Sequence, residues 1–387
     1  MKKKLNNKIK VLLVFGTRPE AIKMAPIFWE LEKNSEVFNT TTCVTSQHKS
    51  LISKLIKSLG IKADFDLRIM KKNQKLSDLT SALLKNINIV IEETKPDIVL
   101  VQGDTISALA GALCAFYNNI KICHIEAGLR SFDMKAPFPE EFCRKSISSI
   151  SYLNFSPTNL NKINLINEGI LKKNIYVTGN TVIDCLFEVL NLYKRNNHIN
   201  NTINKTLDNK ISFNWRSDKF ILITGHRREN IGPAFEKIML ALSSVAKKNK
   251  NINFVYPIHP NPLVRNTFEK ITKKLNNFFI IEPLEYIEFS VLMSKCFFLM
   301  TDSGGIQEEA PSLGKPVLLM REKTERIEGV HQGVVKLVGS NIKTITEEAN
   351  LLISNDQEYI KMSKINNPYG NGKAAKKIIK ILKDRFL

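Results

Sequence analysis

Short apolar runs that are typical of buried strands alternate with helical patterns from one end of this chain to the other. Near-continuous apolar strands separated by helices predict parallel sheets that are covered by helices on both faces. Two such series are present, and we interpret the polar segment 193–217 between them as frayed helix and loop near a domain boundary. The predicted strands are 9–15, 40–45, 98–101, 120–125, 152–155 and 175–177, then 220–224, 253–256, 278–281, 297–301 and 317–319, with helices such as 107–116, 234–247 and 342–353.

The predicted fold class is therefore α/β, with two doubly wound domains that face each other across a cleft. A length of 387 residues fits about two domains. No apolar run approaches the roughly 20 residues that span a bilayer, which predicts no membrane insertion. The basic start and the apolar run 11–15 imitate a signal peptide, but Arg18 and Glu20 follow at once, so a buried first strand fits better.

The chain carries 57 Lys and Arg against 37 Asp and Glu, a formal net charge of +20. Such a charge raises the possibility of a nucleic-acid partner. Lysine is nevertheless spread along the whole chain beside abundant Asn and Ile, and no basic run interleaves with aromatic residues. We therefore predict no nucleic-acid partner, although the positive field can help to attract an anionic substrate.

The six cysteines are scattered and form no C-x-x-C pair. This spacing predicts neither a zinc site nor a disulfide framework. Reduced thiols in a cytoplasmic protein fit it best.

Acidic residues follow two predicted strands of the first series at the point where each strand ends. Asp104 comes just after strand 98–101, and Glu126 directly follows strand 120–125. Glu140 opens a later helix, so the three carboxylates can converge at one rim of the sheet, where ligands of such folds bind. Crowded carboxylates push their pKa values apart, which suits acid and base chemistry. Two structural alternatives stay open: Asp104 as a helix N-cap, and Glu140 as a charge that favours its own helix N-terminus.

The turn after the first strand contains Gly16 but lacks the G-x-G-x-x-G pattern, so it predicts no nicotinamide site. Arg18 and Lys23 lie at the start of the next helix, where cations can meet a phosphate. Solvated charges at a helix start are the alternative.

In the second series, His226 and Arg227 follow strand 220–224 and suggest an anion site. A hydrogen-bonded turn histidine is the alternative for His226, and His259, which lies among prolines, fits a structural role equally well.

The strongest local signal is the segment 300–310, in which a strand runs into Ser303, Gly304 and Gly305 and then into a helix. Glycines let a backbone approach a phosphate, and a helix N-terminus offers N–H groups and partial positive charge. Glu309 can accept hydrogen bonds from ribose hydroxyls. With Arg321 and Arg326 after the next strand, the segment predicts a nucleotide-diphosphate site; a glycine-rich turn with a solvated acidic helix start is the alternative.

Taken together, these segments resemble the non-hydrolysing UDP-N-acetylglucosamine 2-epimerases. They occur in family order and at family spacing over essentially the whole chain. The matching segments are GTRPEAIKMAP (16–26), QGDT (102–105), HIEAGLRS (124–131), PFPEEFCR (137–144), GNTVID (179–184), TGHRREN (224–230), DSGGIQEEAPSLGKPVL (302–318) and NPYGNGKA (367–374).

The resemblance implies two Rossmann-like domains of the glycosyltransferase-B type. Residues 1–178 would form the first domain, with the C-terminal helix 370–387 crossing back onto it, and 179–369 the UDP-binding domain. It further implies reversible conversion of UDP-GlcNAc to UDP-ManNAc, no cofactor and no metal, and a homodimer. The implied nucleotide-sugar contacts are Arg18, Lys23, Asp104, Glu126, His226, Leu284 (through backbone groups), Phe289 (beside uracil), Ser303, Gly304, Gly305, Glu309 and Arg326.

The implied chemistry explains the need for several carboxylates. The sugar C2–H is not next to a carbonyl, so expelling UDP from C1 while a base removes the C2 proton is easier than simple deprotonation. A 2-acetamidoglucal would form, and UDP would add again after protonation from the other face. We assign acid and base roles to Asp104, Glu126 and Glu140, and stabilisation of the departing UDP to His226, Arg18 and the loop 303–305. The product would supply cell-surface polysaccharide synthesis.

Bacterial members of this family are commonly activated by a second UDP-GlcNAc, and Gln47, Glu140, Arg227 and His259 match positions associated with that site. The chain departs from the family pattern at four positions. Asn73 stands where the family often has Arg, Ser50 where it often has Gln, Cys143 where Asn is usual, and Ile327 where Pro often follows the arginine.

Three other functions compete with this interpretation. A glycosyltransferase of the same fold would share the nucleotide site but would not need three carboxylates in the first domain. A hydrolysing epimerase would release free ManNAc and UDP. A non-catalytic UDP-sugar sensor or a basic nucleic-acid binder would not need the acids at all.

Overall fold

The computed structural model describes residues 8–46, 51–70, 74–225, 233–258, 268, 271–272 and 275–387. The chain divides into two compact units. Unit 1 comprises the chain up to Cys185 together with Tyr369–Leu387, and unit 2 comprises Leu186–Pro368. The chain therefore passes from one unit to the other twice.

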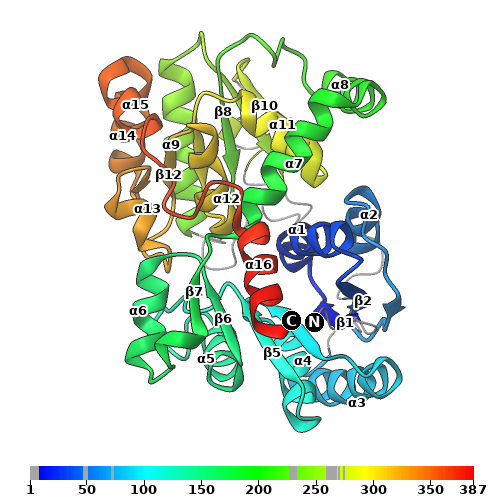
Figure 1. The fold of residues 1–387 in the computed structure, drawn as a ribbon. Coiled ribbons are helices and arrows are strands. Elements are labelled where there is room, and N and C mark those ends of the chain that lie inside the picture. The colour runs from blue at the N-terminus through cyan, green and yellow to red at the C-terminus, as the bar shows by residue number, and fades with distance from the viewer. Residues whose placement is uncertain are drawn as a thin grey trace. The chain divides into compact units, whose positions relative to one another are not determined.

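Unit 1 is built on a seven-stranded parallel sheet with the order β3-β2-β1-β4-β5-β6-β7 (Figure 1). Its central strands are almost entirely apolar and buried, as expected for a sheet with both faces covered. The strands are β1 (Ile9–Phe15), β2 (Phe38–Val44), β3 (Phe65–Asp66), β4 (Ile98–Gln102), β5 (Lys121–Ile125), β6 (Leu153–Ser156) and β7 (Ile175–Val177).

Polar residues that follow strands β1 and β4 cap the helices α1 and α4 of unit 1. Thr17 and Glu20 form a reciprocal capping box at the start of α1, and Thr105 caps α4 by accepting from the N–H of Ala108. The C-terminal helix α16 packs beside α1 (Figure 1). The helices are α1 (Arg18–Lys33), α2 (Leu51–Ser58), α3 (Leu76–Thr94), α4 (Ile106–Tyr117), α5 (Glu140–Ile150), α6 (Asn159–Asn167), η1 (Lys172–Asn174), α7 (Thr181–Arg195, which crosses the unit boundary) and α16 (Ala374–Phe386).

Unit 2 contains a six-stranded parallel sheet with the order β10-β9-β8-β11-β12-β13, the strand order of dinucleotide-binding folds. The two units thus confirm the predicted fold class, with two doubly wound α/β sheets. The elements are β8 (Phe220–Thr224), β9 (Asn253–Pro257), β10 (Phe278–Ile281), β11 (Leu299–Thr301), β12 (Val317–Leu319), β13 (Val335–Leu337), α8 (Asn197–Lys210), α9 (Pro233–Lys248), α11 (Tyr286–Lys295), α12 (Gly304–Glu309), η3 (Ala310–Leu313), α13 (Ile327–His331), α14 (Ile342–Ser354) and α15 (Asp356–Ser363).

Every strand predicted from the sequence is present, with shifted ends in several cases. In the segment 193–217, which was interpreted as frayed helix and loop, residues 211–217 form a loop, but the frayed helix was wrong, because α8 is a regular helix of 14 residues. Asn196 caps it through its side chain, and Ile203 and Leu207, one turn apart, form its buried stripe. The short strands β3 and β13 were missed, since two or three residues carry almost no periodic signal.

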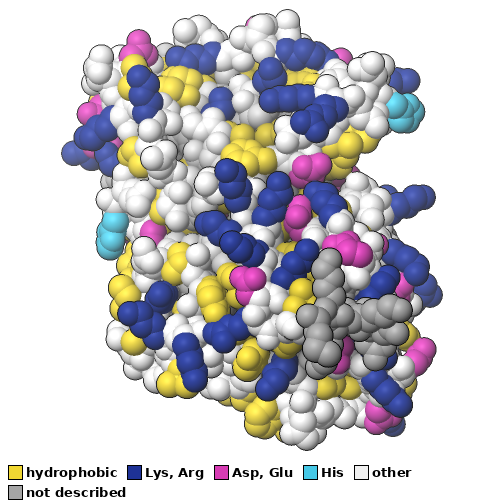
Figure 2. Space-filling model, viewed as in Figure 1, with side chains coloured by type: hydrophobic (Ala, Val, Ile, Leu, Met, Phe, Trp, Pro, Cys, Tyr) yellow, Lys and Arg dark blue, Asp and Glu magenta, His cyan; other side chains and the backbone are white. Residues whose placement is uncertain are grey.

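The visible face of the molecule carries Lys and Arg side chains from top to bottom, interspersed with acidic, apolar and neutral ones (Figure 2). All six cysteines are buried and unpaired. Among the described helices, none is both long and apolar enough to cross a bilayer.

Candidate active site

Asp104 and Glu126 lie at the same edge of the unit 1 sheet. Strands β4 and β5 are parallel neighbours, and their last residues, Gln102 and Ile125, pair with each other. Glu126 follows β5 directly with a φ of 66°, a left-handed conformation that a residue with a side chain rarely adopts. Such backbone strain clusters at functional sites and makes Glu126 a candidate for a functional role.

The Glu126 carboxylate is buried and accepts from the side chains of Lys23 and Asn180. The Lys23 ammonium, on α1, forms an ion pair with its Oε2 atom. The Asn180 side-chain amide donates to the same oxygen at 2.7 Å. Lys23 and Glu126 are 7% and 8% exposed, and the ion pair between them compensates part of each buried charge. Lys23 is thus beside the carboxylate, rather than a solvated charge at a helix start.

Asp104 belongs to a second charged network. The Arg144 guanidinium, on α5, donates to Asp104 Oδ2 and also to Glu141 Oε2, the latter at 3.2 Å. Glu141 is fully buried and accepts the backbone N–H groups of Ser131 and Phe132 at 2.9 and 3.2 Å. Because Thr105 caps α4, the alternative that Asp104 is the N-cap of that helix is wrong.

Glu140 is the first residue of α5 and is half-buried. Its Oε2 atom is buried and has no hydrogen-bond partner within the part of the chain that the structure describes. Burial first, then the charges of Asp104 and Glu140, raise the pKa of the Cys143 thiol to about 12. Both carboxylates therefore lie within electrostatic reach of one buried group, whereas the capping contribution of Glu140 to its own helix stays open.

Glu20 is a buried carboxylate that the sequence interpretation left without a role. It accepts the N–H groups of Gly16 and Thr17 at 3.1 and 2.8 Å and the hydroxyl of Thr105 at 2.7 Å. Burial raises its pKa above the usual range. Its bonds join the turn that carries Arg18, half-buried at the start of α1, to the loop that carries Asp104. The T-x-x-E capping signal was visible in the sequence, but the contact with Thr105 was not.

His124 on β5 is a fully buried histidine behind the two acidic residues. Its Nε2 lies 2.7 Å from the carbonyl of Gly103, which can only accept, so this nitrogen carries the proton. Its Nδ1 therefore accepts from the Ser148 hydroxyl at 3.1 Å. Burial lowers the pKa of His124 to about 4. The neutral ring thus holds the backbone just before Asp104.

The buried His124 makes the stability of unit 1 pH dependent. In the unfolded chain the ring gains its proton below its ordinary pKa of 6.5, while in the folded chain it stays neutral down to about 4. Its stabilisation is present above pH 6.5 and is lost as the pH falls towards 4, by about 3 kcal/mol. We expect His124→Gln to remove this acid destabilisation in urea unfolding curves recorded between pH 4 and 7.

Asp184 acts in the opposite direction, because burial raises its pKa to about 6 and its folded form gains a proton before the unfolded one. The pH dependence of the wild-type free energy of unfolding therefore contains the contributions of both residues. The contribution of His124 is the difference between the pH dependence of the variant and that of the wild type. The exposed His198 on α8 offers a matched control, His198→Gln, which removes a histidine without changing the contacts of His124. An unchanged slope in His124→Gln would contradict the assignment.

In unit 2, the segment 303–305 joins β11 to the short helix α12. The Ser303 N–H donates to Thr301 Oγ1 at 3.0 Å, and its carbonyl accepts from the Gln307 side chain at 3.1 Å. The backbone groups of Ser303 thus form hydrogen bonds within the turn between β11 and α12. Gly304 and Gly305 are the first two helical residues, and such N–H groups have no acceptor within their own helix.

Glu309, the ribose candidate, is 6% exposed and accepts from the Tyr286 hydroxyl at 2.7 Å. Tyr286 opens α11, which also carries the half-buried Phe289. Leu284 lies just before this helix, and its side chain is buried. Tyr286 is a neighbour of Glu309 that sequence reasoning missed.

Arg326 is 7% exposed and lies between two carboxylates. Its Nε donates to Glu308 Oε1 at 2.5 Å, and its Nη1 to Glu325 Oε1. Arg321 donates to Glu325 Oε2 at 3.2 Å. The two arginines predicted for a diphosphate are thus held by acidic side chains, which fixes their position and which sequence reasoning did not anticipate.

Several predicted residues fall outside the described residues. These are His226, Gln47, Arg227 and His259, together with the two departures Asn73 and Ser50. Among the residues that are described, no group of three His, Cys, Asp or Glu side chains could hold a metal ion.

The chain is similar to known proteins along almost its whole length. A family model described as UDP-N-acetylglucosamine 2-epimerase matches residues 30–383. A Campylobacter jejuni protein named UDP-N-acetylglucosamine 2-epimerase is 48% identical over 373 residues, covering 96% of this chain and 97% of the relative. The crystal structure of Neisseria meningitidis UDP-GlcNAc 2-epimerase bound to UDP-GlcNAc is 46% identical with a TM-score of 0.90, covering 97% of this chain and 100% of that one. The Methanocaldococcus jannaschii UDP-GlcNAc 2-epimerase in complex with UDP-GlcNAc and UDP is 32% identical with a TM-score of 0.80, covering 98% and 100%.

Proposed function

We infer from these similarities that the chain, which belongs to the UDP-N-acetylglucosamine 2-epimerase family and is an isomerase, interconverts UDP-GlcNAc and UDP-ManNAc. The observation that supports this chemistry best is the pair Asp104 and Glu126 at the ends of neighbouring strands, each held by its own cation. Inversion at C2 needs a proton removed from one face and returned to the other, which two separately held carboxylates can perform.

The proposed reaction proceeds by elimination and addition. A carboxylate takes the C2 proton while the C1–O bond breaks, so that UDP leaves with the bonding electron pair and a 2-acetamidoglucal remains. A carboxylic acid then returns a proton to C2 from the opposite face, and a UDP oxygen forms the C1–O bond again. The proton transfers are shared by Asp104, Glu126 and Glu140. UDP is the leaving group of the elimination and the nucleophile of the addition.

The other proposed residues bind and stabilise UDP. In unit 1, Lys23 pairs with Glu126, and Arg18 opens the same helix, α1. In unit 2, the first residues of α12, Gly304 and Gly305, with Ser303, would take the diphosphate, Glu309 the ribose, and Phe289 and the Leu284 backbone the base. His226 and Arg326 complete the proposed UDP contacts.

A proton NMR time course with UDP-GlcNAc in deuterated water tests this function. The expected result is a steady ratio of UDP-GlcNAc to UDP-ManNAc with deuterium at C2 of both. Free ManNAc and UDP would instead indicate the hydrolysing reaction. Absence of exchange in the presence of UDP-GlcNAc would contradict epimerisation and favour a transferase that awaits an acceptor.

We also propose that the chain forms a homodimer. Helices α3, α4 and α5 pack side by side in unit 1 and expose large apolar residues. Ile89, Phe116, Tyr117 and Phe142 are 53, 52, 68 and 48% exposed, and such side chains on adjacent helices are typical of an interface. Light scattering should give twice the mass of the chain, and Phe116→Asp with Tyr117→Asp should halve it. A monomeric wild-type protein would exclude the dimer.

Regulation and cellular role complete the proposal. Activation by a second UDP-GlcNAc at Gln47, Glu140, Arg227 and His259 predicts that UDP-ManNAc alone reacts slowly until a trace of UDP-GlcNAc is added.

The unpaired cysteines fit a reducing compartment such as the cytoplasm. There the product would supply ManNAc units for cell-surface polysaccharides.

A further inference from the structure

Asn180 is 2% exposed and uses its backbone and both side-chain atoms in hydrogen bonds within unit 1. Its backbone N–H donates to the Tyr369 carbonyl at 2.7 Å. Its Oδ1 accepts from the Val182 N–H at 3.2 Å, and its Nδ2 donates to Glu126 Oε2 at 2.7 Å. Since a backbone N–H can only donate, Oδ1 must face Val182, and the amide nitrogen must therefore face the carboxylate.

The same residue lies where the two passages of the chain between the units meet. The chain leaves unit 1 after Cys185 and re-enters it at Tyr369. Gly179 and Gly370 both have positive φ, and a Cβ on Gly370 would lie 3.3 Å from the Cα of Gly179. The two segments are therefore packed backbone against backbone, at a distance that only glycine allows comfortably.

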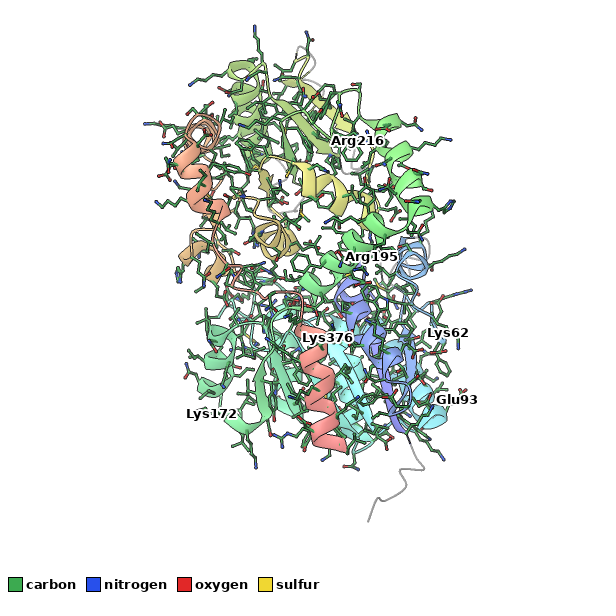
Figure 3. The ribbon with its side chains drawn as sticks, turned by 45° about the horizontal axis from the view of Figure 1, so that its top comes forward. Lys62, Glu93, Lys172, Arg195, Arg216 and Lys376 are labelled. Atoms are coloured by element: carbon green, nitrogen blue, oxygen red, sulfur yellow. The ribbon has the colours of Figure 1, made fainter. Side chains whose placement is uncertain are left out.

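The C-terminal helix is fixed to the same segment. The Asp184 carboxylate on α7 accepts the N–H groups of Ala374 and Ala375, the first two residues of α16, at 3.1 and 2.8 Å. Figure 3 labels Lys376 in that first turn of α16 and Arg195 at the end of α7. One short stretch, from Gly179 to Asp184, thus holds the returning chain at two points and the Glu126 carboxylate at a third.

We propose that Asn180 is a positioning residue that sets the orientation of the Glu126 carboxylate. Through Asn180 this orientation depends on the two packed segments at which the chain leaves and re-enters unit 1. The inference rests on the proposed function, since it assumes that Glu126 transfers a proton at C2. Lys23 supplies the charge that compensates Glu126, but an ammonium on a flexible stem does not define the plane of a carboxylate. The amide of Asn180 is fixed at both ends, by Val182 and by its own backbone, and therefore does so.

The test is a double-mutant cycle between Asn180→Ala and Glu126→Gln, with kcat, KM and the Kd for UDP measured for each protein. Asn180→Ala should lower kcat about 10- to 100-fold, the range for a hydrogen bond to a charged group, with the Kd for UDP unchanged within about twofold. In the Glu126→Gln background the same substitution should change kcat by less than about twofold, because the group through which Asn180 acts is already absent.

Asn180→Asp provides a second variant of the same shape, for use if the alanine variant does not fold. It places a carboxylate against Glu126 and should reduce kcat at least as strongly as alanine, but it should be tolerated beside Glu126→Gln, whose amide can donate to it. Asn277→Ala is the matched control, a buried asparagine in unit 2 whose Nδ2 donates to three backbone carbonyls at 2.9–3.1 Å. It should reduce stability without altering kcat.

Multiplicative losses in the cycle, or an Asn180→Asp variant with wild-type kcat, would overturn the inference. Failure of the proposed function itself has a different signature, since the wild-type protein would then incorporate no deuterium at C2.

Discussion

Glu126→Gln is expected to lower kcat for epimerisation by about 10²- to 10⁴-fold, the usual contribution of a group that transfers a proton. Glutamine keeps the size of the side chain and can still accept from Asn180 and Lys23, so the fold should persist. It cannot take or return a proton at C2. The rate of deuterium incorporation into C2 should fall with kcat, and both can be read from one NMR time course.

A second carboxylate on the same unit provides the control for this result. Glu30 on α1 pairs with Lys33 at 2.8 Å, and Glu30→Gln removes a charge of the same sign without changing either donor to Glu126, Lys23 or Asn180. It should leave kcat within about twofold of the wild type. A Glu126→Gln variant with more than a tenth of the wild-type kcat would mean that another residue transfers the proton.

The common sheet edge of Asp104 and Glu126 could be predicted from the sequence because the fold class dictates where strand ends lie. Once β4 and β5 are recognised as apolar strands of a parallel sheet, Asp104 and Glu126 must follow them at a common edge. The residues that hold these carboxylates could not be found in this way. Lys23 and Asn180 lie 103 and 54 positions from Glu126, and no local pattern encodes such contacts.

The phosphate site predicted in the second half of the chain also shows that sequence patterns do not reveal long-range contacts. The segment 303–309 was recognised as a turn between a strand and a helix, and Arg326 was assigned to a phosphate because of its charge. The structure places that arginine against Glu308, 18 positions away, and beside Glu325. An arginine that binds a ligand and an arginine that pairs with an acidic neighbour can both occur after a buried strand. The charge of the residue therefore could not distinguish these two roles.

Segment 193–217 was misjudged for a related reason. Its Asn and Lys content favours loops, yet α8 needs only a narrow apolar stripe, supplied by Ile203 and Leu207, to pack. Tertiary packing of two residues outweighed the weak helix propensity of many asparagines.

Arg144→Met is expected to lower the free energy of unfolding of unit 1 by about 3–5 kcal/mol, the usual cost of removing one partner of a buried ion pair. The guanidinium is 4% exposed and serves both Asp104 and the fully buried Glu141. Methionine fills much of the volume but leaves the Glu141 carboxylate with only the N–H groups of Ser131 and Phe132. Amide hydrogen exchange along α5 and β5, at several urea concentrations, measures the loss within unit 1.

Two further variants separate charge from packing in this result. Arg144→Met combined with Glu141→Gln removes the uncompensated charge and should restore part of the lost stability, whereas a packing defect would persist. Arg216→Met breaks the exposed pair with Asp208, whose side chains are 40% and 49% exposed, and should cost less than about 1 kcal/mol. If Arg144→Met costs no more than Arg216→Met, the Arg144 network does not stabilise the fold, and the role of Arg144 is then confined to positioning Asp104.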